Sequence, residues 1–126
     1  MSEQHPVGVA FDFSGTVSIV TGSGGGIGQA YAEAIAAAGG AVVVADIDGD
    51  RAESVASGIR GTGATALAVR VDVSDPASAQ AMADATIAEF GGIDHLVNNA
   101  AIFGGMQLDA LVSVDWDYLT RFMAVN

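Results

Sequence analysis

The sequence predicts an α/β fold in which helices cover both faces of a doubly wound parallel sheet. Short valine-rich apolar segments alternate with helix-like segments four times along the chain. Strands that alternate with helices form right-handed crossovers and therefore a parallel sheet. With 126 residues, 51% of them hydrophobic, the chain is one domain at most. We expect an N-terminal tail over residues 1–13 and a single domain over 14–126.

The first strand and the first helix are predicted on either side of a glycine cluster. Residues 16–21 are mostly apolar and β-branched, which predicts a strand. Apolar side chains then recur at a spacing of three and four until Gly39 and Gly40, which predicts a helix. The predicted buried face of this helix comprises Ile27, Ala30, Tyr31, Ala34, Ile35 and Ala38, so Tyr31 is expected to be a core residue.

Three further strands are predicted over 41–46, 64–73 and 93–100. The run 41–46, AVVVAD, is continuously apolar until its last residue, as in a strand that is buried on both faces.

Three further helices follow these strands. Asp48 is a candidate N-cap for a helix that ends near Gly61. Residues 74–76, Ser-Asp-Pro, combine a capping side chain with a first-turn proline and open a helix that runs to about Phe90. A last helical stretch is predicted to begin near Val114.

Composition excludes several classes of function. The net charge is −11 and the four cationic side chains are all arginines, so nucleic acids and anionic membrane surfaces are not expected partners. The chain has no cysteine, which excludes disulfides and thiolate metal sites. No apolar run reaches the roughly 18 residues of a membrane span, and the first residues do not resemble a secretory signal. We expect a cytoplasmic protein.

The glycine cluster T-G-S-G-G-G-I-G, at 21–28, lies where the first strand ends and the first helix begins. A helix N-terminus offers free N–H groups and partial positive charge, and glycine lets a pyrophosphate come close. The spacing G-x-G-x-x-G fails because Ile27 stands at its third glycine, whereas T-G-x-x-x-G-x-G fits on Gly22, Gly26 and Gly28. A dinucleotide site is favoured over a purely structural turn.

Asp46 ends the second predicted strand, 18 residues after Gly28. A carboxylate there can accept hydrogen bonds from ribose hydroxyls and would repel a 2′-phosphate. Ile47 follows it, and no basic residue lies in the glycine loop or directly after Asp46, which favours NAD over NADP. The alternative is that Asp46 only caps the next helix, for which Asp48 is better placed.

Taken together, these motifs resemble the compact short-chain dehydrogenase/reductase family, in its N-terminal cofactor-binding half. The matching pieces are the cluster at 21–28, Asp46, Asp72-Val73, the N-N-A-A run at 98–101 and Asn126, in the order of the family. The resemblance runs from about Phe13 to the end and implies a Rossmann-type sheet. The family usually has glycine where this chain has Ala101.

By this resemblance, Asp72 would bond the adenine amino group with Val73 beside it, and Asn126 would support a proton relay to an active-site lysine. The alternatives are a strand-end turn for Asp72 and a polar residue without function for Asn126. The implied cofactor-binding residues are Gly22, Ser23, Gly25, Gly26, Ile27, Gly28, Asp46, Ile47, Asp72, Val73, Asn99, Ala100 and Ala101.

The resemblance implies an NAD-dependent oxidoreductase that acts on a small alcohol or carbonyl substrate, and a homo-oligomer. The usual catalytic serine and Tyr-x-x-x-Lys are expected to be absent, because the chain has no lysine, Tyr31 is assigned to the core and Phe122 stands four residues after Tyr118. We therefore expect these residues to represent the binding half of a longer enzyme. The alternative is a non-catalytic NAD-binding fragment or interaction module.

No metal site is expected from the two histidines, since His5 lies in the tail and His95 reads as a structural residue of the fourth strand. In the segment after Ala101, Phe103, Met106 and Leu108 are candidates for an apolar substrate pocket.

Overall fold

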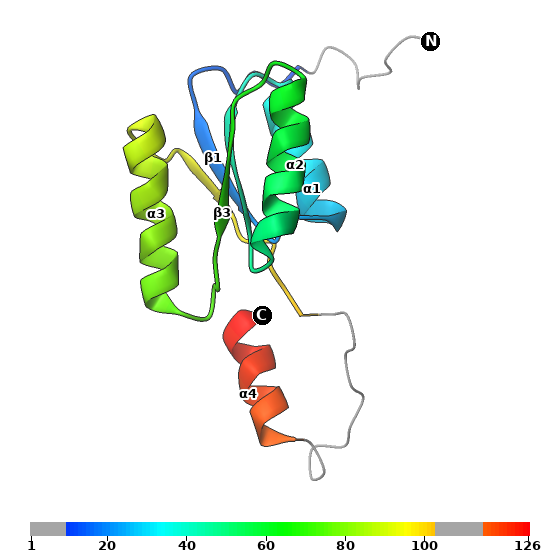
Figure 1. The fold of residues 1–126 in the computed structure, drawn as a ribbon, viewed down its shortest axis with the longest axis vertical. Coiled ribbons are helices and arrows are strands. Elements are labelled where there is room, and N and C mark those ends of the chain that lie inside the picture. The colour runs from blue at the N-terminus through cyan, green and yellow to red at the C-terminus, as the bar shows by residue number, and fades with distance from the viewer. Residues whose placement is uncertain (1–9, 103–114) are drawn as a thin grey trace.

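A computed structural model describes residues 10–102 and 115–126 of the chain. The predicted alternation of strands and helices is confirmed (Figure 1). In chain order the elements are β1 (Val17–Thr21), α1 (Gly26–Ala37), β2 (Ala41–Asp46), α2 (Gly49–Gly61), β3 (Ala66–Arg70), α3 (Pro76–Phe90), β4 (His95–Val97) and α4 (Trp116–Val125). His5, Phe103, Met106 and Leu108 lie outside the described residues.

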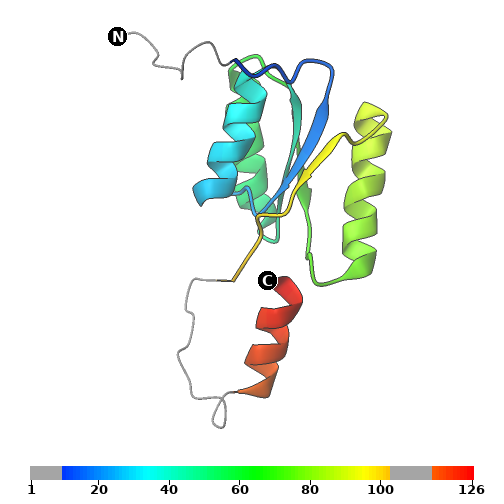
Figure 2. The same cartoon turned by 180° about the vertical axis from the view of Figure 1, so that it is seen from behind.

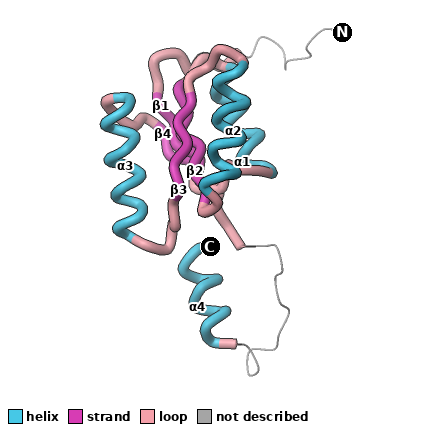
Figure 3. The backbone as a smooth tube through the Cα atoms, in the orientation of Figure 1, coloured by secondary structure: helices cyan, strands magenta, loops and turns pink. Residues whose placement is uncertain are grey.

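The four strands form one parallel sheet in the order β3-β2-β1-β4. Helices α1 and α2 lie against one face and α3 against the other, as two opposite views show (Figure 2 and Figure 3). The predicted doubly wound sheet is therefore confirmed. β3 and β4 are shorter at both ends than the segments 64–73 and 93–100, because regular pairing covers only their middle residues.

Successive side chains of the central strands alternate between two apolar layers. Val20, Val42 and Val44 pack against α1 and α2, whereas Ile19 and Val43 face α3. All five are at most 2% exposed. Burial of each such side chain contributes about 1.5–3 kcal/mol, so the two central strands anchor the edge of the sheet on which the glycine loop lies.

The buried face of α1 differs from the prediction. Gly28, Ala32 and Ala36 are buried, whereas Ile27 is 68% and Tyr31 47% exposed. The assignment of Tyr31 to the core is therefore wrong. Residues without bulky side chains let the helix axis approach the sheet closely, and α1 is apolar on most sides, so its periodicity did not single out one face.

Aspartate side chains cap three of the helices in the described part of the chain. Asp48 caps α2 as predicted, and Asp75 is the capping side chain of the predicted Ser-Asp-Pro start of α3. Asp115 caps α4, which begins at Trp116, two residues after the predicted start near Val114. Helix α4 lies beyond the carboxyl end of the sheet (Figure 1 and Figure 2). Within residues 10–102 and 115–126, each helix is too short or too polar to cross a membrane.

Candidate functional site

A cavity of about 560 Å³ lies where the parallel strands end and the glycine loop begins. Open α/β sheets bind ligands at this edge, outside the carboxyl ends of the strands. Most of the predicted site residues line it, and Arg51 and Val71 line it too. The predicted residues in its wall are Gly22, Gly25, Gly26, Ile27, Gly28, Asp46, Ile47, Val73, Asn99, Ala100 and Ala101.

The backbone of the glycine loop needs glycine at two of the predicted positions. Gly22 and Gly26 have φ angles of 68° and 58°, a region that side chains with a Cβ rarely adopt. A Cβ on Gly22 would also lie 2.8 Å from Ala100 Cα, and one on Gly28 would overlap the Asn99 amide. A Cβ on Gly26, by contrast, would meet nothing within 4 Å, so this part of the loop faces open space.

The N-terminus of α1 differs from those of the three other described helices. Gly25 provides no side-chain cap, and the first turn contains no acidic residue. The earliest backbone bond of the helix runs from the Gln29 N–H to the Gly25 carbonyl, so the N–H groups before Gln29 have no partner within the helix. Unpaired N–H groups beside a cavity, with the positive end of the helix dipole, suit an anionic group such as a pyrophosphate.

Asp46 lies at the end of β2, and backbone N–H groups hold both of its carboxylate oxygens. Oδ2 accepts from the Gly24 N–H at 2.9 Å and Oδ1 from the Asp48 N–H at 3.0 Å. The cap of α2 is Asp48, whose Oδ1 accepts from the Asp50 and Arg51 N–H groups at 3.1 Å. The carboxylate of Asp46 is thus oriented by the loop, and each oxygen keeps a lone pair for a further donor.

Thr21 joins β1 to the N-N-A segment that follows β4. Its hydroxyl oxygen accepts from the Asn99 and Ala100 N–H groups, both at 3.1 Å, and donates to the Val97 carbonyl at 3.3 Å. In return, the Asn99 side chain donates to the Thr21 and Gly22 carbonyls at 3.1 and 3.2 Å. The Asn99 amide thus bridges two backbone carbonyls, and the Thr21 hydroxyl takes a part that the sequence did not predict.

Ser23 carries a structural side chain. Its hydroxyl donates to the Val20 carbonyl at 2.6 Å and accepts from the Ala45 N–H at 3.1 Å, and the residue is fully buried. It therefore holds the loop to β2 and does not line the cavity. Its own N–H donates to the Ala45 carbonyl at 3.1 Å, and contact of Ser23 with a cofactor stays a prediction.

Asp72 lies beside the cavity but outside its lining, between Val71 and Val73, which do line it. Its Oδ1 accepts from the Ser74 hydroxyl at 2.6 Å and the Ser74 N–H at 3.0 Å. The Ser74 hydroxyl, followed by that N–H, lowers the pKa of Asp72 below its ordinary value. This is the geometry of a turn after β3, and contact with an adenine stays a prediction.

Arg51, like Val71, lines the cavity although the sequence did not predict it there. It lies in the first turn of α2, and its Nε donates to the Gly24 carbonyl at 3.3 Å. A Cβ on Gly25 would overlap its guanidinium. Side chains in a helix lean toward its N-terminus, so a basic residue three positions after the cap Asp48 was the available signal. No basic residue lies in the glycine loop or directly after Asp46 in the sequence, but the fold brings the Arg51 guanidinium to Gly25.

Asn126 links the end of α4 to the segment after β4. Its Oδ1 accepts from the Ile102 N–H at 2.6 Å, and its Nδ2 donates to the Ile102 carbonyl at 3.3 Å. It lies outside the lining of the cavity. The bonds show a positioning contact, and the proposed support of a proton relay stays a prediction.

His95 has a structural environment in β4. Its Nδ1 lies 3.1 Å from the Ser18 hydroxyl, and its ring meets that of Phe13 edge to face at 5.5 Å. Among residues 10–102 and 115–126, no group of three or more histidine, aspartate or glutamate side chains is arranged to hold a metal ion.

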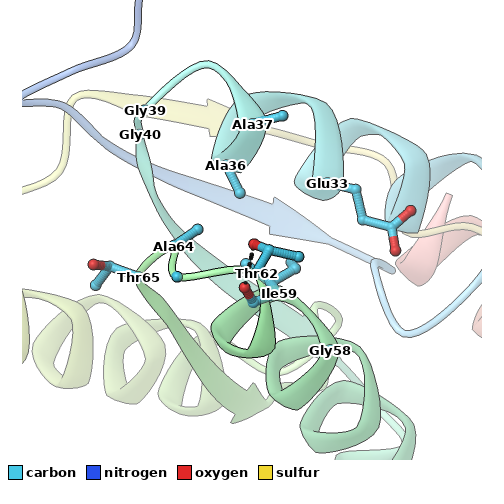
Figure 4. Close-up of a pocket in the computed structure, with 11 residues that line it drawn as sticks. Glu33, Ala36, Ala37, Gly39, Gly40, Gly58, Ile59, Thr62, Ala64 and Thr65 are labelled. Carbon is cyan, nitrogen blue, oxygen red and sulfur yellow. Dashed lines mark hydrogen bonds between the residues drawn. The ribbon is translucent and has the colours of Figure 1, made fainter.

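A second hollow, of about 590 Å³, lies at the amino ends of β2 and β3, between the C-terminal ends of α1 and α2 (Figure 4). Its lining consists mostly of glycine, alanine and threonine, and Glu33 is its one charged residue in the described part of the chain. The hydroxyl of Thr62 is already bonded to the Ile59 carbonyl at 2.7 Å. This hollow is slightly larger, but the chemically distinctive residues converge on the glycine-loop cavity, which we take as the candidate site.

Comparison with known proteins agrees with this geometry. The family model described as short chain dehydrogenase matches residues 16–126. The chain is 58% identical over 114 residues to an uncharacterised oxidoreductase of Mycobacterium tuberculosis, covering 90% of this chain and 46% of that protein. It is 40% identical over 119 residues to D-threitol dehydrogenase of Mycolicibacterium smegmatis, covering 93% of this chain and 46% of that protein.

A solved structure is similar over the same region. The crystal structure of a short-chain type dehydrogenase/reductase from Mycobacterium marinum superposes with a TM-score of 0.84 and 36% identity, covering 91% of this chain and 45% of that one. The chain thus spans just under half the length of each of these three relatives. On the match over residues 16–126 and this likeness of sequence and fold, the chain belongs to the short-chain dehydrogenase family.

Proposed function

We propose that residues 14–126 form the NAD-binding part of an oxidoreductase that acts on an alcohol or carbonyl substrate. The observation that carries the choice of NAD is the Asp46 carboxylate, which two backbone N–H groups hold at the wall of the glycine-loop cavity. A carboxylate in this position accepts hydrogen bonds from the ribose hydroxyls of NAD and repels the 2′-phosphate of NADP.

The residues present fit such a cofactor. The uncapped first turn of α1 suits the pyrophosphate, and Gly26 leaves open space beside it. Ile47, Val71 and Val73 provide an apolar wall on the Asp46 side of the cavity, where we place the adenine. Asn99, Ala100 and Ala101 form the wall at the end of β4, and we assign them to the nicotinamide half.

The bound nicotinamide would supply the hydride acceptor or donor of the reaction. The contribution of this chain is then to orient the cofactor: the Thr21 hydroxyl and the Asn99 amide hold the N-N-A segment against the glycine loop. A wall that these side-chain hydrogen bonds already hold in place reduces the ordering cost of cofactor binding, which favours affinity. We assign to Asn126, which follows α4 and bonds to Ile102 in the segment after β4, a positioning role in proton relay.

An alcohol or carbonyl substrate is favoured because a relative that is 40% identical is named for the oxidation of a polyol, D-threitol. Homo-oligomerisation belongs to the same proposal, as do the cofactor contacts assigned to Ser23 and Asp72. We assign no proton-transfer group among the described residues, since the chain has no lysine to stand four residues after Tyr31 or Tyr118.

Calorimetric titration with NAD and NADP tests the cofactor assignment. Wild-type protein should bind NAD at least about tenfold more tightly than NADP, and Asp46→Asn should reduce that ratio. Asp84→Asn is a matched control, because Asp84 is an exposed aspartate of α3 that bonds only to Gln80 in the described part of the chain. Equal binding of both nucleotides by the wild type, or no binding of NAD, would contradict the proposal.

Turnover separates an enzyme from a binding module. Formation of reduced nicotinamide from NAD with a panel of polyols and secondary alcohols should be followed by its absorbance in the polypeptide that carries this chain. Binding of NAD without any turnover would leave the cofactor assignment intact and would favour a non-catalytic NAD-binding part.

A further inference from the structure

Two opposite charges flank the glycine loop on the side of α2. A Cβ placed on Gly24 would lie 2.8 Å from Asp46 Oδ2 and 3.0 Å from Arg51 Cβ. The acidic and the basic side chain therefore converge on the same stretch of loop, although they lie five positions apart in the sequence. They form no ion pair with each other in the described part of the chain, where the recorded pair is Arg60 with Glu53.

The guanidinium of Arg51 retains most of its donors. Its recorded hydrogen bond uses Nε, which donates to the Gly24 carbonyl, and in the described residues the two terminal nitrogens have no acceptor. The group lies over Gly25, the residue is exposed, and it is the one cation among the described residues that line the cavity. Arginine binds phosphate through paired N–H donors of this kind.

We propose that Arg51 is a specificity-determining residue whose guanidinium is placed to bind a 2′-phosphate, and that the Asp46 carboxylate opposes this binding. The inference rests on the proposed function, because it takes the adenosine ribose of a dinucleotide to lie at Asp46. Cofactor choice is then a balance between two charges on one loop. Removal of the acid alone should convert an NAD site into one that accepts NADP, without introduction of any new basic residue.

A simpler role for Arg51 predicts something different. If the only role of Arg51 is to hold the Gly24 carbonyl through Nε, its loss would loosen the loop and reduce the affinities for NAD and NADP by the same factor. If Arg51 also binds the 2′-phosphate, its loss would reduce the affinity for NADP more than the affinity for NAD. The ratio of the two dissociation constants therefore distinguishes loop support from phosphate recognition.

The test is a double-mutant cycle at Asp46 and Arg51 in the polypeptide that carries this chain. NAD and NADP are titrated by calorimetry into the wild type, Asp46→Ser, Arg51→Met and the double variant. Asp46→Ser should raise the affinity for NADP by about tenfold or more, because a hydrogen bond between charged groups commonly contributes at least this factor to binding. Arg51→Met, added to Asp46→Ser, should remove that gain. The gain should also shrink as ionic strength rises.

Arg60→Met is the matched control. It removes the same charge from the same helix, but Arg60 lies nine residues further along α2 and bonds to Glu53 and the Ala66 carbonyl. It should leave the NADP-to-NAD ratio unchanged. If it shifts the ratio as much as Arg51→Met does, net charge and not a located phosphate contact explains the effect, and the inference is overturned.

The outcomes separate this inference from the proposed function. Absence of NAD binding by the wild type would refute the proposed function. If NAD binds and the ratio of the NADP and NAD dissociation constants is the same with and without Arg51, both with Asp46 and with Asp46→Ser, only the inference would be refuted. Should Asp46→Ser fail to fold, as judged by circular dichroism, the wild type and Arg51→Met compared by competition between the two nucleotides still give the ratio that decides it.

Discussion

The hydroxyl of Thr21 is expected to hold the cavity wall in place, and Thr21→Val removes it with almost no change in side-chain shape. Thr21 is 2% exposed at the end of β1, and its oxygen accepts the N–H groups of Asn99 and Ala100 at 3.1 Å. Valine fills the same space but accepts nothing, so the substitution leaves both donors without that acceptor and opens no cavity.

The cost follows from the hydrogen bonds lost, which are the two that the Thr21 oxygen accepts and the longer one that it donates to the Val97 carbonyl. A net contribution near 1 kcal/mol for each, and somewhat more for a buried N–H left unsatisfied, gives a loss of about 2–3 kcal/mol in the free energy of unfolding. Asn99 and Ala100 also line the cavity, so the affinity for NAD should fall in the same variant. The β4 edge should loosen first, because β4 pairs with only one strand in the described sheet.

Urea unfolding followed by far-ultraviolet circular dichroism measures the change by linear extrapolation. Thr65→Val is the matched control: Thr65 is exposed before β3, and its hydroxyl has no hydrogen bond in the described part of the chain. We expect the control to change the free energy by less than about 0.5 kcal/mol. A loss for Thr21→Val no larger than that of the control would refute the role assigned to the hydroxyl.

Three further substitutions probe the loop and its surroundings. Gly28→Ala should destabilise the protein by about 1–3 kcal/mol and reduce its affinity for NAD, because the added Cβ would overlap the Asn99 amide. An unchanged urea midpoint would contradict this close approach. Ser23→Ala should cost about 1–3 kcal/mol in the same assay, since it strands a buried N–H, and it should leave the NADP-to-NAD ratio unaltered. The hydrogen bonds from Ser74 hold the pKa of Asp72 in the folded protein below its ordinary value of 3.8. These bonds therefore stabilise the folded state above pH 3.8, and this stabilisation is lost as the pH falls through the folded-state pKa. The urea midpoint of Asp72→Asn should therefore depend less on pH than that of the wild type below about pH 4, and parallel curves would count against the bond.

The order of elements, the parallel sheet and the position of the site could be predicted from the sequence. The valine-rich run 41–46 became the buried strand β2, and Asp48 and Asp75 became caps, because strand periodicity and capping depend on residues close together in the chain. The glycine cluster could be placed at the carboxyl edge of the sheet for the same reason, since it directly follows β1.

The side-chain environments around that edge could not be predicted in the same way. Helix α1 is apolar on most sides, so only packing on the sheet decided that Gly28, Ala32 and Ala36 are buried and Tyr31 is not. Ser23 has the sequence position of a loop residue, yet its hydroxyl is buried because β2 runs beside it and presents the Ala45 N–H.

A glycine loop, a carboxylate at a strand end and an N-N-A segment, and their order, are evident from the amino-acid sequence alone. Their contacts come from the packing of the fold, which brings Asn99 against Gly22 across 77 positions and Arg51 against Gly25. The difference arises because strand and helix formation are governed by neighbours along the chain. Contacts between loops depend on how parallel strands pair and how each helix packs on the sheet, which no local pattern encodes.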